Sequence, residues 1–252
     1  MGGGDPAWVG WREALYALLP QWAEAWKAWT PVQRDAALEW ISLFGPKQQP
    51  DLQVALRSEL TSQDQGVTVE QRRTILGSLA EITLTDLRAA YDLSDPAQVD
   101  QAVYWLGATE VRLVRTEEMF EALRPALRPD APAGAAGRML TFGETPSLQR
   151  PLAEALLLHK DARVRRLGLD TLLKRESTED ATLWTAALKD SDVDVRAKAA
   201  GAMGHIASTD VTRALVVALD DPSPKVRDAV LASLEAIQKI EDLKARWRER
   251  TK

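Results

Sequence analysis

Three arginines stand out among the residues that could do chemistry, because they recur at a fixed spacing, which we call the repeat interval. Arg165, Arg196 and Arg227 lie 31 residues apart, and a valine precedes each of them. A column of guanidinium groups is suited to hold carboxylates or another acidic ligand. Asp161 and Asp192 recur at the same interval, each at the start of the segment that contains the arginine. The chain therefore offers its own carboxylates to the same column.

Other kinds of chemistry have little support. His159 and His205 are the only histidines, and they are too far apart to share one helical turn as metal ligands. The absence of cysteine removes thiolate nucleophiles, disulfides and cysteine metal sites. We find no glycine-rich phosphate loop, no nucleophile elbow and no pair of carboxylates that stands out as general acid and base. We expect no catalytic residue, no cofactor and no metal.

The repeat interval extends well beyond the arginines, to apolar positions before and after them. These positions are Val164, Val195 and Val226, then Leu157, Leu188 and Leu219, then Leu172, Met203 and Leu234. Each segment predicts two helices joined by a short polar turn, with Asp161, Asp192 or Ser223 as the cap of the second helix. Helix pairs of about 11–15 residues cannot bury both faces alone, so they must stack on each other.

Residues 147–239 resemble HEAT repeats, in the short-period bacterial form first described in phycobilisome lyases. The resemblance rests on the helix start Asp-x-x-Val-Arg, present at Asp161 and Asp192, with Ser223 replacing the aspartate in the third repeat. It implies an all-α fold, an α-solenoid (superhelix). It also implies that each arginine bridges to an aspartate or carbonyl of a neighbouring repeat, a structural ladder of Asp161, Arg165, Asp192, Arg196 and Arg227. No bilin or phycobiliprotein partner is indicated.

The repeat pattern weakens towards the N-terminus. Residues 130–143 lie one repeat interval earlier without the arginine, and residues 95–107 fit after a small shift in register. We expect about seven HEAT-like pairs in a single right-handed solenoid domain over residues 1–252. Its parts are tryptophan-rich capping helices (1–65), degenerate repeats (66–146), regular repeats (147–239) and a polar cap or tail (240–252).

Six of the nine tryptophans lie in the stretch from Trp8 to Trp40. Trp8 and Trp11 begin one helical stripe, and Trp22, Trp26 and Trp29 form another. These rings either close the open end of the core or form an exposed docking face, since tryptophan is enriched at interface hot spots. The sequence leaves both interpretations open.

Composition limits the class of partner. A formal net charge of -5 argues against nucleic acid, because phosphate neutralisation requires a basic surface. No apolar run approaches the roughly 20 residues of a membrane span, and the first residues lack the features of a secretory signal. The chain also has no asparagine, which is typical of a GC-rich bacterial genome. We expect a bacterial protein of the cytoplasm.

DNA binding is the alternative. HEAT-like alkylpurine DNA glycosylases grip DNA in their concave face with basic and aromatic residues. Residues 160–175 contain six basic and two acidic side chains. Trp105 either faces the concave groove or fills a gap between irregular repeats. Such glycosylases are basic overall, and this chain is not.

The resemblance favours a non-catalytic scaffold or adaptor that binds another protein through its concave face. We expect second helices to line that face, with these positions exposed: Arg166, Asp170 and Leu173, then Ala197, Gly201 and Gly204, then Asp228, Ala232 and Glu235. The middle set would form a low-relief strip for a peptide or helix backbone. Replacing both Gly201 and Gly204 with glutamate should then remove binding without unfolding the chain.

Overall fold

The computed structural model describes residues 28–44, 50–61, 67–108, 112–175, 180–206 and 208–250. Trp8, Trp11, Trp22 and Trp26 lie outside these ranges. Whether the N-terminal tryptophans close the core or form a docking face is therefore a question about residues outside the described part of the chain. No helix within the ranges is long and apolar enough to cross a bilayer.

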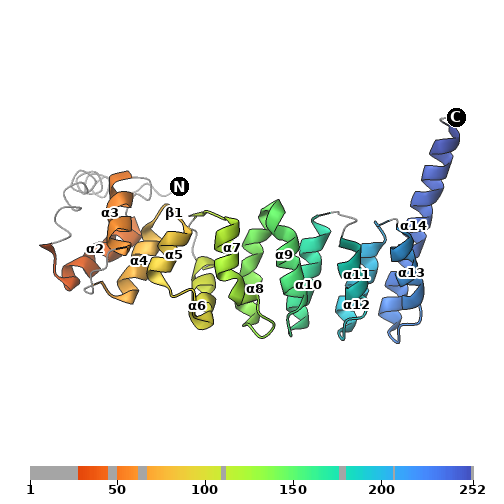
Figure 1. Cartoon of the computed structure of the whole chain (residues 1–252), viewed down its shortest axis with the longest axis horizontal. Helices are drawn as coiled ribbons and strands as arrows, with labels where there is room; N and C mark the ends of the chain where they lie inside the picture. Colours follow the sequence, from red (N-terminus) through yellow and green to blue (C-terminus); the bar gives the residue numbers. More distant parts are fainter. Residues whose placement is uncertain are drawn as a thin grey trace, which may run out of the picture. The chain divides into compact units, whose positions relative to one another are not determined.

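The described chain is mostly helical, with a single short pair of strands, which confirms the predicted all-α, solenoid class (Figure 1). It forms two compact units that divide between Leu123 and Arg124. The first contains α2 (Pro31–Phe44), α3 (Pro50–Leu60), α4 (Val69–Ser78), β1 (Glu81–Ile82), α5 (Leu84–Ala90), α6 (Pro96–Leu106), β2 (Arg112–Leu113) and α7 (Glu117–Leu123). The second contains η2 (Arg124–Leu127), α8 (Ala133–Arg138), η3 (Met139–Glu144), α9 (Pro146–Leu157), α10 (Ala162–Leu173), α11 (Ala181–Ala187), α12 (Val193–Met203), α13 (Thr209–Ala218) and α14 (Pro224–Arg250). That the whole chain is a single right-handed solenoid domain stays a prediction.

The first unit is irregular. Helix α4 contacts α2, α3 and α5, and α5 contacts α7. A short parallel pair joins β1 to β2, with Ile82 opposite Leu113, and the sequence pattern did not predict it. Helix α6 begins as expected for residues 95–107, because the Asp95 carboxylate accepts a hydrogen bond from the Ala97 amide and Pro96 needs no amide partner there.

The second unit contains the regular repeats. Helices α9 and α10 form one pair, α11 and α12 the next, and α13 and α14 the last. The second helices α10, α12 and α14 contact one another in succession, and α11 contacts α13. The pairs are thus stacked in two layers, and all three second helices belong to one of them.

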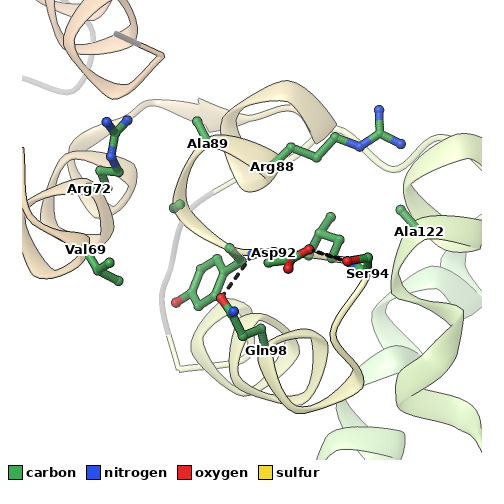
Figure 2. Close-up of a pocket in the computed structure, with 11 residues that line it drawn as sticks. Val69, Arg72, Arg88, Ala89, Asp92, Ser94, Gln98 and Ala122 are labelled. Atoms are coloured by element: carbon green, nitrogen blue, oxygen red, sulfur yellow. Dashed lines mark hydrogen bonds between the residues drawn. The ribbon is translucent and has the colours of Figure 1, made fainter. Parts of the chain in front are cut away.

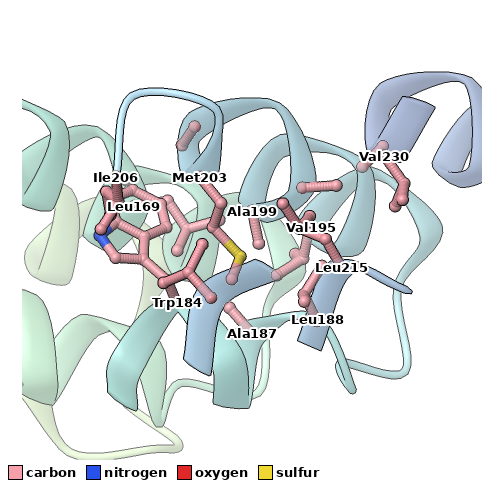
Figure 3. Packing of buried hydrophobic residues seen from close by; sticks show 14 of the residues in the cluster. Leu169, Trp184, Ala187, Leu188, Val195, Ala199, Met203, Ile206, Leu215 and Val230 are labelled. Carbon is pink, nitrogen blue, oxygen red and sulfur yellow. The ribbon is translucent and has the colours of Figure 1, made fainter. Parts of the chain in front are cut away.

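The core of this unit runs through the stack. Val164, Val195 and Val226, which recur at the repeat interval, are at most 2% exposed. Figure 3 shows the cluster between the layers, with the ring of Trp184 at one end and Val230 at the other. Full burial of one such side chain contributes about 1.5–3 kcal/mol. The repeat is therefore held together by apolar positions that the sequence pattern identified.

Two segments differ from expectation. The degenerate repeat expected over residues 130–143 contains, in place of one long second helix, a short α8 followed by the 3-10 segment η3, since Gly134 and Gly137 weaken a helix. The expected polar cap or tail at 240–252 is no separate element, because α14 continues unbroken to Arg250. Gly204 follows the last residue of α12, whereas the equivalent residue of the next repeat, Glu235, permits α14 to run on.

Candidate functional site

The arginine column forms a ladder between repeats. The Nε and Nη2 groups of Arg165 donate to the two carboxylate oxygens of Asp190 at 2.8 and 2.7 Å. Its Nη1 group donates to the carbonyl oxygens of His159 and Lys160 at 2.9 and 2.8 Å. One guanidinium therefore joins the turn before α10 to the turn before α12.

Arg196 repeats this arrangement one pair later. Its Nε and Nη2 groups donate to Asp221 at 2.7 and 3.1 Å, and Nη1 donates to the carbonyls of Asp190 and Ser191 at 2.9 and 3.2 Å. Arg227 keeps the carbonyl half of the pattern, with Nη1 bonded to the carbonyls of Asp221 and Pro222 at 2.7 and 3.1 Å. The guanidinium groups of Arg165 and Arg196 thus already have hydrogen-bond partners within the protein.

The carboxylates of the ladder are not the expected ones. Asp161 and Asp192 cap α10 and α12, where they accept amide hydrogen bonds from the first helical turn. The amides of a helix start need such an acceptor, so the capping carboxylate is already engaged. Asp190 and Asp221 occupy the turns just before the cap positions, and they face the arginine of the preceding repeat. They also recur at the repeat interval, a signal that the sequence analysis missed.

Electrostatics favour the ionised ladder. Burial pushes the pKa of Asp190 upward, but hydrogen bonds from Arg165 and from the Asp192 amide outweigh it, so this pKa lies below its usual value. The hydrogen bond from Arg196 is the main cause of the lowered pKa of Asp221. Both rungs are therefore ion pairs at neutral pH, with side chains at most 14% exposed.

His159 marks the first end of the ladder. It lies one repeat interval before Asp190, and its Nδ1 atom accepts from the Asp161 amide at 2.9 Å, as Asp190 Oδ1 accepts from the Asp192 amide. Its Nε2 atom lies 2.9 Å from the Ala131 carbonyl oxygen, which requires the proton on Nε2. Gly134 stands where the preceding repeat would need an arginine. His159 is 4% exposed, and both of its ring nitrogens are engaged with backbone groups.

A second set of ion pairs lies on the solvent-facing side of α10, α12 and α14, which we call the second-helix face. Asp194 accepts from Arg166 at 3.3 Å and from Lys225 at 2.6 Å, so one carboxylate joins all three helices. Lys198 of α12 pairs with Asp170 of α10 at 2.5 Å. The proposed partner-binding residues Arg166 and Asp170 are therefore paired across repeats.

The basic segment over residues 160–175 is largely neutralised. Each of its four arginines holds an aspartate, in the pairs Arg163–Asp161, Arg165–Asp190, Arg166–Asp194 and Arg175–Asp180. Phosphate binding depends on cations that can exchange counterions for phosphates. Arginines already held by carboxylates are poorly suited to it, so this arrangement does not favour the DNA alternative.

The low-relief strip on α12 is smaller than expected. Gly201 is exposed, and an added Cβ would meet no atom within 4 Å. Gly204 is buried, because α14 passes so close that an added Cβ would lie 3.0 Å from Ser233 Oγ and 3.1 Å from its Cα. Ala197 is 8% exposed, since α12 has a second helix on either side. The expected exposure of Gly204 and Ala197 was therefore wrong.

Of the other positions expected to be exposed, Arg166 and Asp170 on α10 are half-buried, whereas Leu173 on α10 and Asp228, Ala232 and Glu235 on α14 are exposed. Ala232 lies one repeat interval after Gly201, so two small residues occupy equivalent places on neighbouring helices. Partner binding at these positions stays a prediction. The double substitution at Gly201 and Gly204 no longer suits as a test, because glutamate at Gly204 would collide with Ser233.

Trp105 packs within the first unit. Its ring lies over Gly77 of α4, where an added Cβ would be 3.5 Å from the Cζ2 atom. The side chain is half-buried. This contact is the gap-filling arrangement that the sequence left open, and it leaves part of the side chain on the surface.

An open depression of about 730 Å³ in the first unit was not anticipated (Figure 2). Arg72 and Arg88 stand at different parts of its rim and do not converge. Arg72 donates to the Leu60 carbonyl, and the Asp92 carboxylate is held by the amide and hydroxyl of Ser94 at 3.0 and 2.6 Å. Arg72 and Asp92 are thus engaged locally. The described ranges contain no group of three or more His, Asp or Glu side chains that could hold a metal.

Comparison with known proteins bears on the second unit. Residues 181–249 match the family model for HEAT repeats. No curated protein matches the chain. Among solved structures, the crystal structure of an engineered protein from the Northeast Structural Genomics Consortium is similar over 88% of this chain and 96% of its own, with 20% identity and a TM-score of 0.28. The matched repeats are the ones that carry Asp190, Arg196 and Asp221.

Proposed function

The chain carries HEAT repeats, and from this premise we propose that it is a non-catalytic scaffold or adaptor of the bacterial cytoplasm that binds another protein. HEAT repeats build extended binding surfaces by stacking, and they commonly serve protein–protein interaction. The particular phycobilisome-lyase type of repeat stays a prediction. The binding surface we propose is the second-helix face, as the concave side of the stack.

One observation carries this choice of face. Gly201 is exposed on the middle helix with open space around it, and Ala232 is exposed at the equivalent place on α14. Small residues let a partner backbone approach a helix closely. The paired charges of Asp194, Arg166 and Lys225 border this strip and offer a polar rim, as protein interfaces have. Arg165 and Arg196 of the ladder, by contrast, already bind aspartates within the chain.

The test is a single substitution, Gly201→Glu, with Ala186→Glu as matched control. Both residues are exposed, but Ala186 belongs to the first helix α11. Gly201→Glu adds a charged side chain to the strip without a steric collision, so we expect a folded protein that loses its partner. Affinity capture from an extract of the producing cells, compared between the two variants, measures this. Equal capture by both variants would refute the choice of face.

The DNA alternative is tested separately. We expect no gel shift with duplex DNA at low salt, because the arginines of residues 160–175 hold aspartates. A shift that disappears on raising the salt concentration would contradict the proposal and favour the nucleic-acid interpretation.

A further inference from the structure

The last helix pair exposes positions that are buried in the pairs before it. Leu231 is 50% exposed, whereas its equivalents in the two earlier pairs, Leu169 and Ala200, are both 0% exposed. Leu234 is half-buried, whereas its equivalents Leu172 and Met203 are at most 1% exposed. These positions are buried in the earlier pairs because the next pair covers them. We call this uncovered surface of α13 and α14 the end face.

Arg227, on the same helix, also lacks contacts that its equivalents in the earlier pairs make. In Arg165 and Arg196 the Nη1 group bonds to two carbonyls of its own turn, and the Nε and Nη2 groups bond to an aspartate of the next turn. Arg227 makes the two carbonyl bonds. Across the described residues, no carboxylate lies within ion-pair distance of it. Its guanidinium is thus held in place with the bidentate side open.

The chain does not turn back over the end face within its described part. In the middle repeat the chain leaves α12 at Gly204 and returns as α13. At the equivalent place after Glu235, α14 continues to Arg250 as one helix (Figure 1). Within the described structure, the side of α14 that no further helix covers presents leucine and an open arginine.

We propose that the end face docks a helical hairpin of a partner protein whose inter-helix turn carries an aspartate. The chain itself shows the fit twice. Helix α12 of the α11–α12 pair packs on α10 and this pair places Asp190 on Arg165, and the α13–α14 pair packs on α11 and α12 and places Asp221 on Arg196. An incoming hairpin would cover Leu231 and Leu234 and give its carboxylate to Arg227. This surface is distinct from the second-helix face.

The probe is a fluorescently labelled synthetic peptide of residues 208–238, which is the α13–turn–α14 hairpin with Asp221 in its turn. Fluorescence anisotropy with the full chain measures binding. We expect saturable binding that Leu231→Glu in the chain weakens at least tenfold, because an exposed leucine can be replaced without disturbing the fold. Arg163→Ala is the control, as a surface arginine away from the end face, and it should bind the probe like the unaltered chain.

A charge exchange tests the bidentate contact itself. The chain variant Arg227→Asp should lose the probe, and the probe variant Asp221→Arg should bind that chain better than it binds the unaltered chain. Circular dichroism of each chain variant checks that it is folded. Leu231→Glu should leave capture through the second-helix face unchanged, so the two proposals fail independently.

Three results would overturn the proposal. The first is no saturable binding of the probe to the unaltered chain. The second is binding that Leu231→Glu and the charge exchange leave unchanged. The third is a dimer in sedimentation that Leu231→Glu converts to a monomer, since the end face would then be occupied by a second copy of the chain.

Discussion

Arg196→Ala tests the ladder most sharply, because Arg196 has a matched surface counterpart. The substitution removes two hydrogen bonds to Asp221 and two to carbonyl oxygens, and it leaves the Asp221 carboxylate, which is 8% exposed, without its guanidinium. Removing one partner of a fully buried ion pair costs about 3–5 kcal/mol. Since the Arg196 side chain is 14% exposed, we expect a loss of about 2–4 kcal/mol.

The assay is thermal unfolding followed by calorimetry. A loss of this size should lower the Tm by roughly 6–12 °C. The control Arg163→Ala removes an arginine that is 78% exposed and paired with Asp161 on the surface, so it should leave the Tm unchanged. Asp221→Asn should reproduce most of the loss, and the double variant should lose little more. An Arg196→Ala protein as stable as Arg163→Ala would refute the ladder as a structural element.

Two further predictions concern packing and pH. Gly168→Ala should lower the free energy of unfolding by about 1–3 kcal/mol, because its Cβ would lie 3.1 Å from the Ala153 carbonyl oxygen, whereas Gly201→Ala, with open space around it, should be neutral or stabilising in urea unfolding. The lowered pKa values of Asp190 and Asp221 stabilise the folded chain above about pH 4, and this contribution is lost as the pH falls through the lowered folded values. The stability difference between the unaltered chain and Asp190→Asn should therefore shrink below about pH 4, and a constant difference down to about pH 2 would contradict the ionised ladder.

The regular half of the fold was predictable because one physical constraint repeats there. Each helix pair must bury the same positions against its neighbours, so Val164, Val195 and Val226 recur and are all buried. The arginine column was predictable for the same reason. Its carboxylates were misassigned because a helix cap and a ladder rung both need an aspartate, and the two candidates lie almost side by side in the sequence. Spacing alone does not decide between Asp190 and Asp192.

The features that the sequence did not predict depend on distances between helices, and the spacing of residues in a sequence does not give these distances. Gly204 is buried because α14 approaches α12 at Ser233, whose hydroxyl donates to the Ala200 carbonyl at 2.8 Å. The corresponding residues Leu173 and Glu235 are exposed, so the repeat pattern placed Gly204 on the wrong side. The first unit lacks the regular period, and its β1–β2 pair has no counterpart among the described residues of the regular repeats.

Hydrogen–deuterium exchange of the chain with its captured partner tests the central claim most directly. If the partner binds the second-helix face, its addition should slow exchange in α10, α12 and the repeat part of α14, and leave α9 and α11 unchanged. Protection confined to α9, α11 and α13, or to the first unit alone, would contradict the account.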